Sequence, residues 1–182
     1  EHDELRRLLT LLIENKREED EIVVQADQGN TTNLVYGVLH DFITKIKLLE
    51  FPLKGNFGAF KNNLKSHCIG EWIFQIDADE MLEPDLIVNL EDILSNNMDK
   101  ELILIPRINI VNGIKPEHVE KWGWNMNESG WINFPDVQTR LYKKSDKIAW
   151  IGKVHERIVG IESYTNFPMD ELYCLKHIDR KS

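Results

Sequence analysis

The most constraining feature of the sequence is an apolar run, residues 72–76, that ends abruptly in the acidic residues Asp77, Asp79 and Glu80. The run suits a buried strand, and in an open α/β sheet ligands bind outside the carboxyl ends of the strands. Asp77 and Asp79 lie two positions apart, so they point to one side while the chain is extended. Paired carboxylates of this kind favour a site for Mg²⁺ or Mn²⁺ and a diphosphate. Alternatively, Asp79 and Glu80 are a helix-start cluster before Pro84 that the helix dipole stabilises.

The composition limits the class of protein. With 182 residues, 42% of them hydrophobic, the chain is long enough for one domain with a substantial core. A formal net charge of −9 argues against a surface that coats nucleic acid, because that binding needs clustered Lys and Arg. Cys68 and Cys174 fit a reducing compartment, and no run approaches the roughly 20 apolar residues of a membrane span. We therefore expect a soluble cytoplasmic protein that is at most peripheral to a membrane.

Alternating helical and strand patterns predict an α/β fold with a mixed sheet and an antiparallel addition toward the C-terminus. The expected helices cover 1–12, 33–44, 57–68 and 83–94, and the expected strands cover 21–26, 46–51, 72–76, 102–110 and 137–142. The strand at 72–76 is expected in the centre of the sheet. Residues 122–131, which contain three tryptophans, are expected to form a loop that packs as a lid or contacts an acceptor.

Several segments resemble the family-two glycosyltransferases. Residues 27–32 (Asp-Gln-Gly-Asn-Thr-Thr) are similar to the family's Asp-Ser-Gly-Ser-Thr-Asp loop, and residues 57–62 (Phe-Gly-Ala-Phe-Lys-Asn) to its Phe-x-x-x-Arg-Asn helix start. Residues 70–80 resemble its Gly-Asp-Trp turn and Asp-x-Asp strand end. Residues 135–142 and 150–156 resemble a bacterial and viral branch that acts on lipopolysaccharide-core-like glycans. The resemblance extends over nearly the whole chain.

The resemblance implies a GT-A fold, which is a Rossmann-type mixed sheet flanked by helices. We expect a single domain over 1–182, with its nucleotide-binding part over 1–95 and its acceptor side over 96–182. The family's fold begins with a strand of the type Val-Ile-Ile-Pro-Thr-Tyr-Asn in the middle of the sheet, and no segment of this sequence corresponds to it. Either the chain is part of a longer one or it departs from the family, which would put its activity in doubt.

The resemblance also implies that the chain binds a nucleotide-diphosphate sugar, with UDP favoured, and Mn²⁺ or Mg²⁺. Asp77 would contact the ribose or the metal, Asp79 would bind the metal, and His177 is the candidate for a further metal ligand. A cation across the diphosphate would neutralise the charge that grows as the glycosidic bond breaks. Other donor contacts are carried over to Asp27, Lys61 and Asn62. Lys61 stands where the family has Arg, which keeps the charge but loses the bidentate fork.

An inverting transfer needs a general base that takes the proton from the acceptor hydroxyl. Glu156 lies where the resemblance places the family's catalytic acid pair, although the second acid is Arg157 here, and Asp136 is the second candidate. His155 could orient Glu156, bind phosphate or ligate the metal. The predicted function is a metal-dependent glycosyltransferase that acts on a glycan, a lipid-linked glycan or a protein. The alternatives are a non-catalytic sugar- or nucleotide-binding module and a nucleotidyltransferase, for which the expected Gly-rich, basic phosphate loop is not visible.

Overall fold

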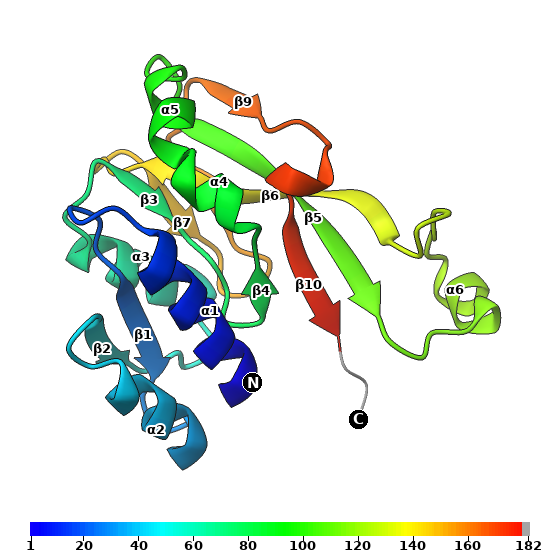
Figure 1. The fold of residues 1–182 in the computed structure, drawn as a ribbon, viewed down its shortest axis with the longest axis horizontal. Coiled ribbons are helices and arrows are strands. Elements are labelled where there is room, and N and C mark those ends of the chain that lie inside the picture. Colours follow the sequence, from blue (N-terminus) through cyan, green and yellow to red (C-terminus); the bar gives the residue numbers. More distant parts are fainter. Residues whose placement is uncertain (180–182) are drawn as a thin grey trace.

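The computed structural model describes residues 1–179 and has the expected α/β fold, with helices packed on β-sheets, the largest of which is mixed (Figure 1). The helices are α1 (His2–Asn15), α2 (Asn33–Asp41), α3 (Phe57–His67), α4 (Pro84–Val88), α5 (Leu90–Ser95), α6 (Pro116–Trp122) and the 3₁₀ turn η1 (Glu171–Tyr173). The strands are β1 (Val23–Asp27), β2 (Lys47–Phe51), β3 (Trp72–Phe74), β4 (Glu80–Met81), β5 (Leu102–Val111), β6 (Ile132–Lys143), β7 (Ala149–Ile151), β8 (Arg157–Val159), β9 (Tyr164–Asn166) and β10 (Leu175–Asp179). No helix in the described range is long and apolar enough to cross a membrane.

The strands form separate sheets. β1 and β2 pair in parallel as a sheet of their own, and β7 and β8 form an antiparallel pair. The larger sheet has the order β3-β6-β5-β10-β4, with β9 also paired to β5. Within residues 1–179 no strand joins β1 to β3, so β3 lies at the end of the larger sheet and pairs with β6 alone. The expectation that this strand is central is therefore wrong for the described chain.

Strand β5 has different neighbours along its two halves. On one side it pairs antiparallel with β6. On the other side Leu102–Leu104 pair with β9, whereas Arg107–Val111 pair with β10. Pro106, which has no backbone N–H to donate, lies between these two partners. This position explains how a proline fits into a strand that has neighbours on both sides.

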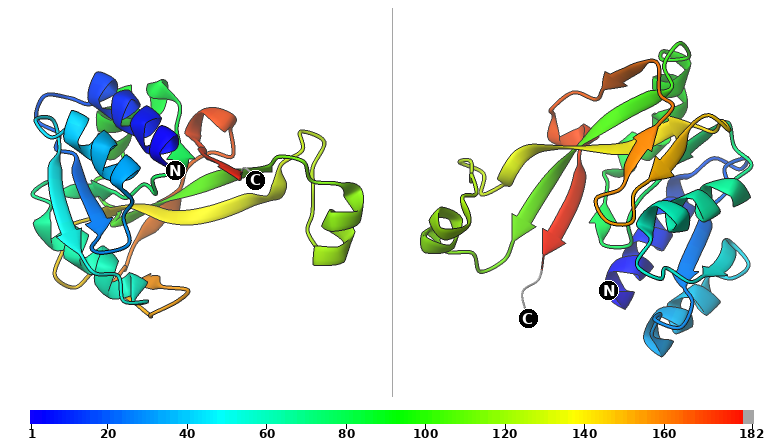
Figure 2. Two further views of the ribbon diagram at one scale, coloured as in Figure 1. Left: turned by 90° about the horizontal axis from the view of Figure 1, so that it is seen from below. Right: turned by 180° about the vertical axis from the view of Figure 1, so that it is seen from behind.

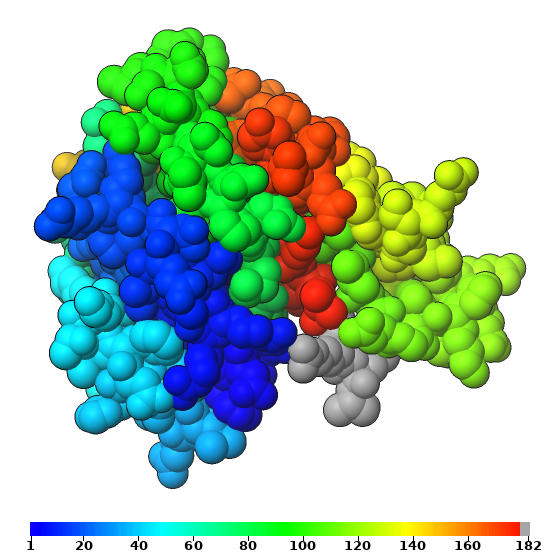
Figure 3. Space-filling view, viewed as in Figure 1, coloured from blue at the N-terminus to red at the C-terminus, as the bar shows by residue number. Residues whose placement is uncertain are grey.

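Strands β5 and β6 run out to α6, which stands apart from the rest of the protein (Figures 2 and 3). Near the tip, the rings of His118 and Trp122 stack with their centres 5.1 Å apart, and Trp122 packs on Trp124 at 4.8 Å. The expected loop over 122–131 is confirmed except at its first residue, because α6 ends at Trp122, residues 123–131 connect the two elements and β6 begins at Ile132. Pro116 in the first turn and Gly123, which has a left-handed φ of 64°, are the local signals for this helix.

The hydrophobic core has separate clusters that α1 connects. Leu5 and Leu9 of α1 pack with Val38 and Leu39 of α2 and with Ala26 of β1. A second cluster lies between α4 and strands β5, β6 and β10. α1 also contacts α4 and β4, so it spans both parts of the fold.

The expected helix over 83–94 is divided in the structure. α4 ends before Asn89, whose φ of −91° and ψ of 4° are not helical, and α5 begins directly after it. The Asn89 side-chain amide donates to the carbonyl of Asp85 (2.7 Å). Such local side-chain hydrogen bonds compete with the helical pattern, which explains the break.

Candidate functional site

The acidic segment after β3 forms a tight turn into β4. The N–H of Gln75 still donates to the carbonyl of Arg140 in β6 (2.8 Å). The turn then closes because the N–H of Glu80 donates to the carbonyl of Asp77 (3.0 Å), while the Glu80 carboxylate accepts from the N–H of Asp77 (3.0 Å). This turn directs Glu80 into the protein and leaves Asp77 at the end of the strand.

A buried charge network lies under this turn. Nη2 of Arg140 donates to Oε1 of Glu80 (2.7 Å) and to Oδ2 of Asp77 (2.5 Å), and Nη1 of Arg107 donates to the same Glu80 oxygen (3.1 Å). Arg140 is only 4% exposed and Glu80 only 1%. Burial alone lowers the pKa of Arg140, but the charges of Glu80 and Asp77 outweigh it and raise the pKa above its ordinary value. Because buried charges must be paired, the network fixes Asp77 against β6.

Asp136 accepts hydrogen bonds at both carboxylate oxygens. Its Oδ2 accepts from Nε and Nη2 of Arg107 (3.0 and 2.7 Å) and from Asn109 (2.9 Å), and its Oδ1 accepts from Gln138 (2.7 Å). Burial raises the pKa of Asp136, but the bonds from Asn109 and Arg107 lower it overall. Asp136 is therefore held as a carboxylate of low basicity.

The start of α3 is pressed against the segment that follows β7. The N–H groups of Phe57 and Gly58 donate to the carbonyls of Lys153 (3.0 Å) and Gly152 (3.1 Å). A Cβ on Gly58 would lie 2.6 Å from the Gly152 carbonyl oxygen, so only glycine fits without a backbone shift. This close contact brings the residues of α3 next to the loop that carries Glu156.

Trp150 forms a fixed wall beside this contact. Its backbone bonds the side-chain amide of Asn62, and its Nε1 donates to the hydroxyl of Tyr142 (3.1 Å). The Tyr142 hydroxyl donates in turn to Oε1 of Gln75 (3.2 Å). Burial raises the pKa of Tyr142 to about 12, so the Tyr142 hydroxyl is protonated at neutral pH and can donate to Gln75.

Lys61 and Glu156 form an ion pair beside the Trp150 ring. Nζ of Lys61 lies 2.5 Å from Oε1 of Glu156 and 4.4 Å from the centre of the Trp150 ring. The side chains of Lys61 and Glu156 are only 13% and 17% exposed. Burial alone raises the pKa of Glu156, but the hydrogen bond and charge of Lys61 lower it overall.

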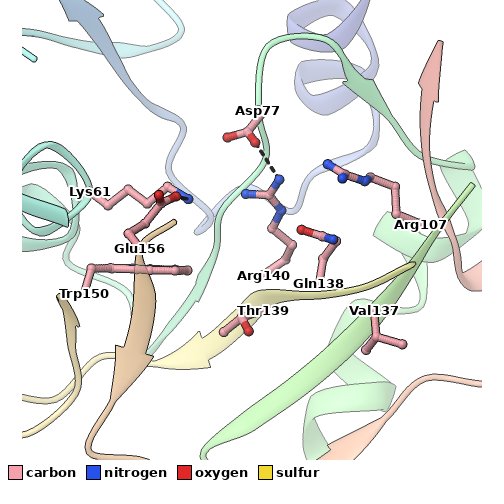
Figure 4. A pocket seen from close by; sticks show the side chains of 9 residues that line it. All are labelled: Lys61, Asp77, Arg107, Val137, Gln138, Thr139, Arg140, Trp150 and Glu156. Atoms are coloured by element: carbon pink, nitrogen blue, oxygen red, sulfur yellow. Dashed lines mark hydrogen bonds and ion pairs between the residues drawn. The ribbon is translucent and has the colours of Figure 1, made fainter. Parts of the chain in front are cut away.

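These groups surround a cavity of about 300 Å³ (Figure 4). Its lining residues come from α3, the turn after β3, β5, β6, β7 and the loop before β8: Lys61, Asp77, Arg107, Val137, Gln138, Thr139, Arg140, Trp150 and Glu156. The cavity thus brings together the predicted residues Lys61, Asp77 and Glu156, with Asp136 bound to a lining arginine. Charged donors of this kind recognise phosphate and carboxylate groups.

Asp79 and His177 meet at a separate place beside the turn. β10 pairs with β4 so that His177 lies opposite Glu80, and its Nε2 is 3.3 Å from Oδ2 of Asp79. Their hydrogen bond raises the pKa of His177 and lowers that of Asp79. Asp77, the third predicted metal ligand, instead bonds Arg140. No group of three His, Cys, Asp or Glu side chains in residues 1–179 is arranged to hold a metal ion.

The other predicted site residues are not among the side chains that line this cavity within the described part of the chain. Asp27 closes its own loop, because its Oδ1 accepts from the N–H of Leu53 (2.9 Å) and its Oδ2 from Asn30 (2.8 Å). Asn62 bonds the backbone of Trp150. His155 is exposed and has a left-handed φ of 54°. The binding roles of these residues remain predictions.

The site also contains residues that the sequence reasoning did not identify. Arg107, Arg140 and Trp150 line the cavity, and Glu80 links both arginines. The available signal was an arginine within each of two predicted strands, because an arginine that becomes buried requires an acidic partner. Which acid it bonds was not evident, since Arg140 and Asp77 are 63 residues apart.

Comparisons with known proteins show similarity in part of the sequence and in the fold. No protein-family model matches the sequence. Over 83 residues the chain is 34% identical to an uncharacterized glycosyltransferase of Haemophilus influenzae, a match that covers 44% of this chain and 31% of that protein. The structure of this chain is similar to that of S. aureus TarS 1–349 in complex with UDP-GlcNAc. The TM-score is 0.64 and the identity 16%, over 98% of this chain and 55% of the TarS chain.

TarS 1–349 in complex with UDP gives a TM-score of 0.61, again at 16% identity, over 96% of this chain and 56% of that chain. The chain thus spans 31% of the Haemophilus protein and just over half of the TarS chains. It shares the fold of TarS, a protein crystallised with UDP-GlcNAc, and part of its sequence is similar to that of a glycosyltransferase.

Proposed function

We propose that this chain is the donor-binding and catalytic part of a family-two, GT-A glycosyltransferase that transfers a sugar from a UDP-sugar to a hydroxyl acceptor. The carrying observation is the cavity after β3, where Lys61, Arg107 and Arg140 lie beside Asp77 and Glu156. The cations suit the diphosphate, and the carboxylates suit sugar hydroxyls and proton transfer. The fold similarity to TarS in complex with UDP-GlcNAc and with UDP, and the partial identity to a glycosyltransferase, support this choice of donor.

Glu156 is the better candidate for the general base. The Asp136 carboxylate accepts hydrogen bonds from Arg107, Asn109 and Gln138, which leave little capacity for a further proton donor. Glu156 lines the cavity, and Lys61 is its ion-pair partner. Glu156 would therefore have to exchange a single ion-pair partner, not a set of hydrogen bonds, to accept a proton.

In the proposed transfer, the acceptor oxygen attacks the anomeric carbon from the face opposite the diphosphate. A new bond forms between these two atoms, and the bond from the anomeric carbon to the diphosphate oxygen breaks. The electron pair of the broken bond leaves with the nucleoside diphosphate. The acceptor proton passes to the Glu156 carboxylate, and the anomeric configuration is inverted.

Asp79 and His177 fit a divalent cation, Mn²⁺ or Mg²⁺. They supply one carboxylate and one imidazole, and a cation that also binds phosphates needs only one or two carboxylates from the protein. Such a cation, when bound, neutralises the charge of the leaving diphosphate. Both ligands must be deprotonated to bind a cation, so the cation would replace the hydrogen bond between Asp79 and His177.

The test is a thermal-shift panel of UDP, GDP, CDP and dTDP, each with and without Mn²⁺. A ligand that binds only the folded state stabilises it by about 2.7 kcal/mol at 100 times its dissociation constant. We expect UDP to raise the melting temperature, and more strongly with Mn²⁺. If no nucleotide raises it, the proposed donor site is wrong. Release of pyrophosphate from a nucleoside triphosphate would instead support a nucleotidyltransferase.

A further inference from the structure

Lys61 differs from the other cations of the cavity in the number of carboxylates that it holds. Three carboxylates at the cavity each bond a cationic side chain, in the pairs Asp77–Arg140, Asp136–Arg107 and Glu156–Lys61. Both arginines also bond the buried Glu80, so each holds two carboxylates. Within residues 1–179, Glu156 is the one carboxylate that Lys61 bonds. An incoming anion can therefore draw Lys61 away with the loss of a single ion pair.

The surroundings of Lys61 favour an exchange of partners. The face of the Trp150 ring attracts the ammonium group, whose Nζ lies 4.4 Å from the ring centre. Asn62 holds the backbone of Trp150, and the Tyr142 hydroxyl accepts from the ring nitrogen Nε1. The ring therefore does not have to move when the lysine does. A lysine has a flexible stem and a point charge, whereas an arginine holds a carboxylate through two parallel hydrogen bonds. Lysine at this position thus suits an exchange better than arginine.

We propose that Lys61 is a donor-dependent switch, which bonds Glu156 in the empty cavity and moves to the diphosphate when the nucleotide sugar binds. The movement frees Glu156 to accept the proton of the acceptor hydroxyl. This inference rests on the proposed function and adds an order of events to it. The diphosphate binds first, and its binding releases Glu156 to act as the base.

The exchange changes the basicity of Glu156 in a defined direction. Burial raises the pKa of Glu156, and the hydrogen bond from Lys61 lowers it to below its ordinary value. A carboxylate held by a cation is a weak proton acceptor. When Lys61 leaves, the burial and the smaller effect of the Arg140 charge remain, while the hydrogen bond and the charge of Lys61 are removed, so the pKa rises. Glu156 then accepts the proton of a hydroxyl more readily.

The test follows the Glu156 carboxyl by NMR in the full chain, labelled with ¹³C at the glutamate Cδ atoms and assigned with Glu156→Gln. The probe is UDP with Mg²⁺, and a thermal-shift titration first establishes that it binds. We expect UDP to move the titration midpoint of Glu156 to higher pH. Lys61→Met should have the higher midpoint without UDP and show a smaller further rise with UDP than the unchanged protein does. This variant should also bind UDP about tenfold more weakly, as expected for one lost charge-assisted hydrogen bond.

Control variants separate the exchange from general effects. Lys153→Met removes an exposed lysine from the same loop as Glu156 and should behave as the unchanged protein does. Lys61→Gln is a second uncharged variant if Lys61→Met does not fold. UDP that binds without moving the Glu156 midpoint would overturn the exchange and leave the donor site intact. If UDP does not bind to the unchanged protein, the proposed function itself is overturned.

Discussion

Asn62 in α3 holds the backbone of Trp150 in β7 from both directions. Its Nδ2 donates to the Trp150 carbonyl (2.7 Å), and its Oδ1 accepts from the Trp150 N–H (2.9 Å). One side chain thereby satisfies the donor and the acceptor of a residue 88 positions away. Asn62 acts on the cavity through Trp150, whose ring lies beside Lys61, and is thus a positioning residue.

Replacing Asn62 with alanine should destabilise the protein. The substitution removes the partners of the Trp150 N–H and carbonyl, and an unsatisfied buried group costs about 1–3 kcal/mol. Urea denaturation measures the effect as a lower midpoint. Asn96→Ala is the control, because the exposed Asn96 side chain donates to the nearby carbonyl of Asp92, and its loss should cost no more than about 0.5 kcal/mol. Equal midpoints for the two variants would contradict the role of Asn62.

Gly58→Ala should also destabilise the protein, for a steric reason. The new Cβ would lie 2.6 Å from the carbonyl oxygen of Gly152, and relief of such an overlap costs about 1–3 kcal/mol. Gly37→Ala in α2 is the matched control, because a Cβ there would have no atom within 4 Å in the described chain apart from its chain neighbours and the backbone of its own helix. Alanine exceeds glycine in helix propensity by about 1 kcal/mol, so this control should be stabilised. Melting temperatures that shift in the same direction would refute the steric argument.

Glu156→Gln should abolish sugar transfer while UDP still binds. A general base contributes about 10²- to 10⁴-fold to the rate, and glutamine cannot accept the acceptor proton. The rate of UDP release from UDP-GlcNAc, tested with candidate acceptors, measures the loss. Glu162→Gln is the control, since the Glu162 side chain is 79% exposed. Full turnover by Glu156→Gln would assign the base role to Asp136 or to another residue.

Asp79→Ala should remove the effect of Mn²⁺ on UDP binding. The variant lacks the carboxylate proposed to hold the cation, so UDP should raise the melting temperature equally with and without the metal. Asp99→Ala is the comparison, because Asp99 is 71% exposed and bonds Lys100. If Mn²⁺ still strengthens UDP binding to Asp79→Ala, the metal role of this residue is refuted.

The His177–Asp79 pair should make the stability depend on pH. The hydrogen bond to Asp79 raises the pKa of His177 in the folded protein above the ordinary value of about 6.5. Its contribution is therefore complete below about pH 6.5 and is lost as the pH rises through the folded pKa. The free energy of unfolding, without metal, should differ between the unchanged protein and His177→Gln more at pH 6 than at pH 9. A difference that is constant over this range would contradict the ion pair.

Local patterns in the sequence correctly predicted most of the elements. Helical spacing of Leu5 and Leu9 indicated α1, and Pro52 marked the end of β2 after Phe51. The same local logic could have found α6, because Pro116 and Gly123 carry its start and end signals. It could not give the position of β3 in the sheet, because that depends on which strands lie beside it.

The site was only partly predictable for a related reason. Asp77, Lys61 and Glu156 were identified from motifs, and the structure brings them to one cavity. Their partners come from distant positions, such as Arg140 for Asp77, and no local pattern specifies which acid and base will meet. Asn62 shows the same limit. Its motif assigned it to the nucleotide, but its side-chain amide bonds the backbone of Trp150 in β7.

The division of β5 at Pro106 separates two regions that can change independently. One half of β5 pairs with β9, which lies within the segment around residues 160–168. Arg107 and Asn109 belong to the other half, which pairs with β10. An insertion or a change of sequence near β9 would alter the pairing of Leu102–Leu104 and leave the hydrogen bonds from Arg107 and Asn109 to Asp136 in place. The charged cavity can therefore keep its geometry when the chain changes in length around β9.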